Sequence, residues 1–161
     1  MLCKYCGEQL DPPHENRGFC GDCYDIIIKD PLSFKKEILD NIDLPFFVVS
    51  QSSQRVVTAN EEFLNFISKS FDQIANQLGG DVIGCIHAAN PHGCGKGEFC
   101  SKCPIRNLVQ KTIDTQNPQK HVHVVQLIKH EGETKDISLH VTTRIKNGYV
   151  LLQIDDYEFL S

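Results

Sequence analysis

The chain has 161 residues, a formal net charge of −5 and 40% hydrophobic residues, which is enough for one core plus a small appendage. It has no run of lysine and arginine to suggest a nucleic-acid-binding protein, and no apolar run reaches the roughly 20 residues of a membrane helix. The first residues lack the apolar segment of a signal peptide, so we expect a cytoplasmic protein whose eight cysteines serve metal or redox chemistry.

The first four cysteines predict a zinc site. They follow the pattern Cys-x2-Cys-x13-Cys-x2-Cys, and each Cys-x2-Cys turn can aim two thiolates at one ion. We therefore predict a zinc ribbon over residues 1–30, with zinc bound by Cys3, Cys6, Cys20 and Cys23. A redox or disulfide pair and a rubredoxin-like iron site are the alternatives.

The chain after residue 30 should form a helix, a hairpin and further helices. Phe34, Ile38 and Ile42 recur at helical spacing, and the apolar runs 45–50 and 55–59 are separated by four polar residues. A helical stretch then runs from residue 60 to the glycine pair at 79–80, with a capping box at Ser70-x-x-Gln73 that restarts it.

The last third predicts one helix followed by three strands. Pro104 suits a first helical position, and an apolar stripe continues from it towards Pro118. Strands are expected over 121–128, 136–145 and 149–154, with a tight turn at Asn147-Gly148. In the middle strand, one face should be apolar, and the other should carry Ser138, His140, Thr142 and Arg144.

This order of elements resembles a PAS sensor domain, in which helices cover one face of a five-stranded antiparallel sheet. The resemblance runs from about residue 32 to the C-terminus and rests on Ile42-Asp-Leu-Pro45, Thr58-Ala-Asn60, Ile83-Gly84 and Leu152-Gln-Ile-Asp155-Asp156. It implies an α+β fold, with a PAS-like domain over 31–161 and the small zinc ribbon before it. It also implies a homodimer formed through the leading helix, which presents Phe34, Ile38, Leu39, Ile42 and Leu44. The packing of that stripe on its own domain is the alternative.

The departure from a plain PAS domain is a cysteine-rich insertion over residues 85–103. It holds Cys85, Cys94, Cys100 and Cys103 in nineteen residues, with several glycines that let the backbone wrap closely around a metal. If Pro104 begins a helix, Cys103 occupies its N-cap, where the helix dipole favours a thiolate. The elements Gly93-Cys94-Gly95 and Cys100-Ser-Lys-Cys103 resemble a cysteine-bearing subgroup of PAS domains, and some PAS sensors hold iron–sulfur clusters on four cysteines.

Several interpretations of this second quartet remain open. We favour an iron–sulfur cluster, but structural zinc, a dithiol/disulfide switch and unmetallated cysteines are alternatives. His87 or His92 could replace one thiolate, most readily Cys85, although both are more simply solvent-facing loop residues. The strand histidines His121, His123 and His140 are expected on a polar face.

We find no motif of an enzyme: no Walker loop, nucleophile elbow, kinase signature or HExxH. The sequence therefore predicts a small redox- or gas-responsive signalling module that holds an iron–sulfur cluster or another metal and signals by contact with a partner protein. The alternatives are an interaction adaptor with zinc in both four-cysteine sites and a PAS sensor of a small ligand.

Overall fold

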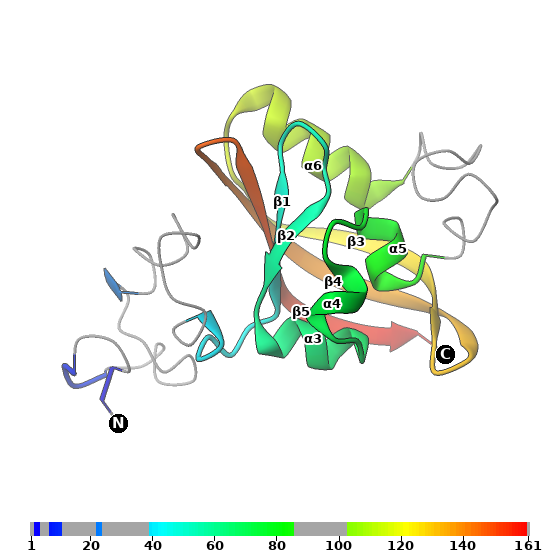
Figure 1. Ribbon diagram of the computed structural model, residues 1–161, viewed down its shortest axis with the longest axis horizontal. Coiled ribbons are helices and arrows are strands. Elements are labelled where there is room, and N and C mark those ends of the chain that lie inside the picture. Colours follow the sequence, from blue (N-terminus) through cyan, green and yellow to red (C-terminus); the bar gives the residue numbers. More distant parts are fainter. Residues whose placement is uncertain (1, 4–6, 11–21, 24–38, 86–102, 161) are drawn as a thin grey trace.

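The computed structural model describes residues 2–3, 7–10, 22–23, 39–85 and 103–160. Its elements, shown in Figure 1, are β1 (Phe46–Ser50), β2 (Val56–Ala59), α3 (Glu61–Ile67), α4 (Phe71–Ile74), α5 (Gly79–Ile83), α6 (Pro104–Thr115), β3 (Gln119–His130), β4 (Glu133–Lys146) and β5 (Tyr149–Leu160). No helix within the described residues is both long and apolar enough to cross a membrane.

The strands form one antiparallel sheet in the order β2-β1-β5-β4-β3. This confirms the predicted hairpin and the predicted three-stranded meander. The strands of the meander are longer than expected, because β3 and β4 remain paired as far as His130 and Glu133 and β5 continues to Leu160. Asn147 and Gly148 both have positive φ, as the predicted tight turn requires.

The predicted helical stretch from 60 to 80 is wrong in its second half. The capping box is present, since the Ser70 N–H donates to Gln73 Oε1 at 2.8 Å, but α4 ends at Ile74. The backbone then bonds to β2, with Asn76 N–H donating to Val56 O and Val56 N–H donating to Gln77 O, both at 2.9 Å. These contacts compete with helical bonds, so the glycine pair begins α5 and does not end a helix.

The sheet has a buried cluster on each face, because successive residues of a strand point to opposite sides. On one face, Phe47, Val49 and Leu152 pack with residues from α3, α4, α5 and α6. On the other face, Phe46, Val48 and Leu151 form a second cluster, whose remaining members are Cys3, Leu10, Cys23, Leu39 and Ile42. The described N-terminal residues therefore cover β1 and β5 on the side away from the helices.

Asn60 joins three parts of this domain. It is fully buried, and its Oδ1 accepts from the backbone N–H of Phe46 and of Phe63, both at 3.0 Å. Its Nδ2 donates to Ile42 O at 3.1 Å and to Leu44 O at 2.9 Å. One side chain thus caps α3 and fixes the lead-in to β1, which explains why an asparagine stands in the predicted Thr58-Ala-Asn60 element.

Replacement of Asn60 should be strongly destabilising. In Asn60→Ala two backbone donors and two carbonyls lose their partner, and we expect the free energy of unfolding to fall by about 3–5 kcal/mol. Urea denaturation followed by circular dichroism measures this loss. The matched control is Asn65→Ala, an exposed position of the same helix, where the change should stay within about 0.5 kcal/mol. Equal, small effects of both substitutions would contradict the assigned role.

Candidate functional site

Two cysteines of the second quartet meet at one buried side chain. Gln126 Nε2 donates to Cys85 Sγ at 3.0 Å, and Cys103 Sγ donates to Gln126 Oε1 at 3.8 Å. Gln126 lies in β3 and is 5% exposed, Cys85 is buried, and Cys103 is partly buried. Cys94 and Cys100, like His87 and His92, lie outside the described residues. The structure therefore brings the first and last cysteines of the insertion to one amide.

Cys85 is held in place by the backbone around Gly84. Gly84 ends α5 with φ of 82°, and its carbonyl accepts from Lys129 N–H at 2.7 Å. A Cβ at Gly84 would lie 2.8 Å from Lys129 O, so only glycine allows this close approach to β3. Cys85 then pairs with Ile128 as an isolated β-bridge, and its thiol is thereby fixed beside the sheet.

Cys103 is positioned by the start of α6. Pro104 is the first helical residue, as predicted, and Cys103 is the N-cap. Its carbonyl accepts from Asn107 N–H at 2.9 Å, while its side chain makes no capping bond and instead contacts Gln126. Leu108 and Val109 bury the inner face of the helix in the core. The apolar stripe of α6 thus fixes where the Cys103 thiol lies.

Sequence reasoning missed Gln126. Its neighbours Val124 and Ile128 are buried on the helix-covered face of the sheet, and Gln126 occupies the position between them on that same face. A polar side chain in a run of buried apolar positions needs hydrogen-bond partners, and that interruption was a signal the sequence did contain. Only the fold identifies the partners as the two cysteines.

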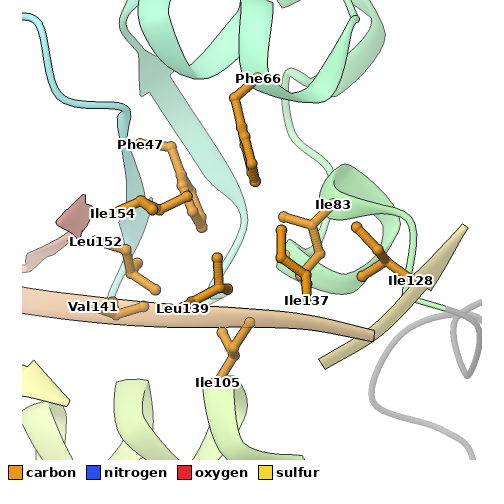
Figure 2. A pocket seen from close by; sticks show the side chains of 11 residues that line it. Phe47, Phe66, Ile83, Ile105, Ile128, Ile137, Leu139, Val141, Leu152 and Ile154 are labelled. Atoms are coloured by element: carbon orange, nitrogen blue, oxygen red, sulfur yellow. The ribbon is translucent and has the colours of Figure 1, made fainter. Parts of the chain in front are cut away.

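An apolar pocket lies next to this thiol pair. Its lining comes from β1, α3, α5, α6, β3, β4 and β5, and it includes Ile83 and Ile105, each two residues from a cysteine, together with Ile128. Figure 2 shows these side chains around the space between the sheet and the helices. The volume is about 30 Å³. A cavity that binds benzene has about 150 Å³, so this pocket is far smaller than a drug-sized ligand needs.

Two cysteines of the first quartet are buried in the same cluster. Cys3, from the first Cys-x2-Cys pair, and Cys23, from the second, are buried in the same cluster with Leu10, on the face of the sheet away from the helices. Cys6 and Cys20 lie outside the described residues. This arrangement places one thiol of each pair in a common environment, and zinc binding by Cys3, Cys6, Cys20 and Cys23 stays a prediction.

Comparison with known proteins gives structural likeness alone. No family model and no curated protein matches the sequence. Among solved structures, the d2 variant of RsLOV has a TM-score of 0.51 at 17% identity and covers 82% of this chain and 69% of its own. The LOV protein of Rhodobacter sphaeroides has a TM-score of 0.51 at 16% identity, and the match covers 78% of this chain and 65% of that protein. The PAS domain of the fruit-fly ELK potassium channel has a TM-score of 0.49 at 16% identity, and the match covers 79% of this chain and 94% of that domain.

These identities bear on the fold and not on the chemistry of the site. The five-stranded antiparallel sheet and the helices packed on it match the predicted architecture. The segment from β1 to β5 has the fold of PAS and LOV domains.

Proposed function

We propose that this protein is a redox- or gas-responsive signalling module, without catalytic activity, in which Cys85, Cys94, Cys100 and Cys103 bind an iron–sulfur cluster in the PAS-fold domain. A change at the cluster would be transmitted to a partner protein by contact. The observation that carries the proposal is the convergence of Cys85 and Cys103 on Gln126.

The donor set fits such a group. Four thiolates are the usual ligands of an iron–sulfur cluster, and hydrogen bonds to the sulfurs tune its reduction potential. Gln126 supplies one such bond, from Nε2 to Cys85 Sγ, in a buried position that excludes competing water. The cluster, when bound, would supply one-electron chemistry. The described part of the chain positions two of the proposed ligands, Cys85 at an isolated β-bridge and Cys103 at a helix N-cap.

The position of the thiol pair offers a route to the rest of the domain. Cys85 follows α5, Cys103 precedes α6, and Gln126 lies in the middle of β3. A change in the charge or geometry of the sulfurs would therefore act on two helix ends and one strand together. The α6 helix packs on β3, β4 and β5, so a shift at its start would reach most of the meander.

The alternatives make different demands on the same residues. An adaptor with zinc in both cysteine sites would use Cys85 and Cys103 as structural ligands only, since zinc has no redox chemistry. A sensor of a small ligand would use the apolar pocket, and its volume of about 30 Å³ would have to grow before it could admit a ligand of ordinary size.

The experiment is metal, sulfide and spectral analysis of protein purified without oxygen, with Gln126→Met as the matched variant. A brown protein containing iron and sulfide, from which Cys85→Ser removes both, supports the proposal. Gln126→Met keeps every thiol and removes the N–H donor to Cys85, so the cluster should remain while its reduction potential falls. A colourless protein that binds two zinc ions would instead support the adaptor.

Homodimer formation is a second part of the proposal. Leu39 and Ile42, from the leading stripe, are buried within their own chain, while Val125 and Tyr149 of the sheet remain 42% and 39% exposed. Val125 and Tyr149 lie towards opposite ends of the sheet face away from the helices, and a second copy that packs along this face could cover both. Sedimentation of the metal-loaded protein should give a dimer mass, and Val125→Glu should weaken association. A monomer mass at every concentration would contradict it.

A further inference from the structure

The face of the sheet opposite the pocket carries a compact group of polar residues, which we name the histidine cluster: His121, His123, His140, Asp155 and Asp156. The flanking residues Leu139 and Val141 of β4 line the pocket, so His140 points to the other side of the sheet. His121 and His140 stack with ring centroids 4.3 Å apart and planes at 6°. The ring centroids of His123 and His140 are 5.0 Å apart.

Two β-bulges bring these residues together. In β5, the neighbours His140 and Val141 pair with Asp156 and Ile154, so Asp155 is an extra residue. In β3, Gln119 pairs with Thr143 and Val122 pairs with Val141, so β3 has two residues between these pairs where β4 has one. One of these two residues is His121, whose φ is 49°. A regular strand would send adjacent side chains to opposite faces, whereas the β5 bulge lets two adjacent aspartates contact histidines on one face.

Hydrogen bonds orient each member of the cluster. His121 Nδ1 lies 3.2 Å from Asp155 Oδ2, and His140 Nδ1 lies 2.5 Å from Asp156 Oδ1. Asp155 is itself fixed, because it accepts from Thr142 Oγ1 at 2.6 Å and from Gln153 Nε2 at 2.7 Å. The aspartate that contacts His121 therefore has its own supporting partners, an arrangement typical of histidines that bind a metal.

Three potential ligand atoms of the histidine cluster lie close together. A nitrogen of His121, a nitrogen of His140 and a carboxylate oxygen of Asp156 lie within 4.8 Å of one another. Ligand atoms of one tetrahedral zinc ion at about 2.0–2.2 Å are about 3.3–3.6 Å apart, so these side chains would have to move together by about 1 Å. The stacked imidazoles of His121 and His140 would also have to rotate out of their parallel arrangement, so that one ion lies in the plane of both rings. The side chains of His121 and His140 are 61% and 33% exposed, which leaves the site open to ions from solvent.

We propose that His121, His140 and Asp156 bind a divalent transition-metal ion of the zinc and nickel class on the surface of the sheet, with Asp155 as the residue that positions His121. The ion would take the place of the hydrogen shared between His140 and Asp156, and solvent would complete its coordination. None of the three ligands of this site belongs to either cysteine quartet. It offers nitrogen and oxygen ligands where the quartets offer sulfur, and nickel and zinc accept imidazole readily.

The test is equilibrium dialysis with Ni²⁺ against the full chain, handled without oxygen and with its cysteine sites already loaded. The wild type should bind one additional equivalent. His140→Gln and Asp156→Asn should each weaken binding at least about tenfold, and Asp155→Asn by about 10–100-fold. The matched control is His130→Gln. His130 is another histidine of β3 beside a carboxylate, 3.8 Å from Glu131, but far from the cluster in the strand, and its loss should leave the affinity unchanged.

A second readout locates the ion. Paramagnetic Ni²⁺ should broaden the amide signals of residues 120–123, 139–142 and 154–157 before other signals, and circular dichroism should show that each variant is folded. Three outcomes would overturn the proposal: no additional equivalent, equal affinity in the wild type and His140→Gln, or broadening confined to the region of the cysteines.

Discussion

Cys3→Ser and Cys23→Ser should each abolish zinc binding in the first quartet and unfold the N-terminal 30 residues, while the sheet stays folded. Structural zinc contributes about 10–16 kcal/mol of apparent folding free energy in small four-ligand sites at neutral pH. Apart from the buried Leu10, the segment between the two cysteine pairs is mostly polar and contains prolines, so little else would keep it folded. Metal analysis combined with limited proteolysis measures both effects.

The control must separate loss of metal from loss of packing, because both cysteines are buried. Leu10→Ala serves this purpose, since Leu10 is 2% exposed in the same cluster and has no metal-binding atom. This substitution should lower the free energy of unfolding by about 2–5 kcal/mol and leave one zinc ion bound. A zinc chelator should reproduce the cysteine variants in the wild type. Stoichiometric zinc and an intact, protease-resistant N-terminus in Cys23→Ser would disprove the zinc site.

Loss or oxidation of the predicted cluster should loosen the cysteine insertion and the beginning of α6. Without the ligand bonds, the contacts of Cys85 and Cys103 within the described residues are the hydrogen bonds to Gln126 and the adjoining backbone contacts. We therefore expect hydrogen exchange at residues 85–107 to accelerate about tenfold or more in air-exposed protein, while β4 and β5 keep their protection. Exchange measured by mass spectrometry in reduced and air-exposed samples tests this.

Thr112→Val provides the matched control for that experiment. Thr112 is fully buried in the middle of α6, and its hydroxyl lies 2.6 Å from the hydroxyl of Thr143 and donates to Leu108 O at 2.9 Å. Its replacement should weaken α6 to the same degree in both redox states, because it is remote from the thiols along the helix. Equal protection of residues 85–107 in the reduced and air-exposed wild type, with metal retained, would leave a structural site and no switch.

The order and faces of the elements were predictable because they depend on local pattern. The alternation of polar and apolar residues in β4 predicted that Leu139 and Val141 lie on one face and His140 on the other. Pro104 predicted the start of α6, and Asn147-Gly148 predicted a turn. Each of these features is a property of a few neighbouring residues. Such residues have the same conformational preferences wherever the segment finally packs.

Contacts between distant segments decided the rest. The sequence by itself determined two cysteine quartets, a polar strand face and the PAS-like order of elements. Only the tertiary structure ended α4 at Ile74, through hydrogen bonds to β2, and placed Gln126 between Cys85 and Cys103. It also introduced the β5 bulge at Asp155, which lies beside His121. Pairing register and bulges depend on how whole strands fit together across the sheet, and no local periodicity encodes that fit.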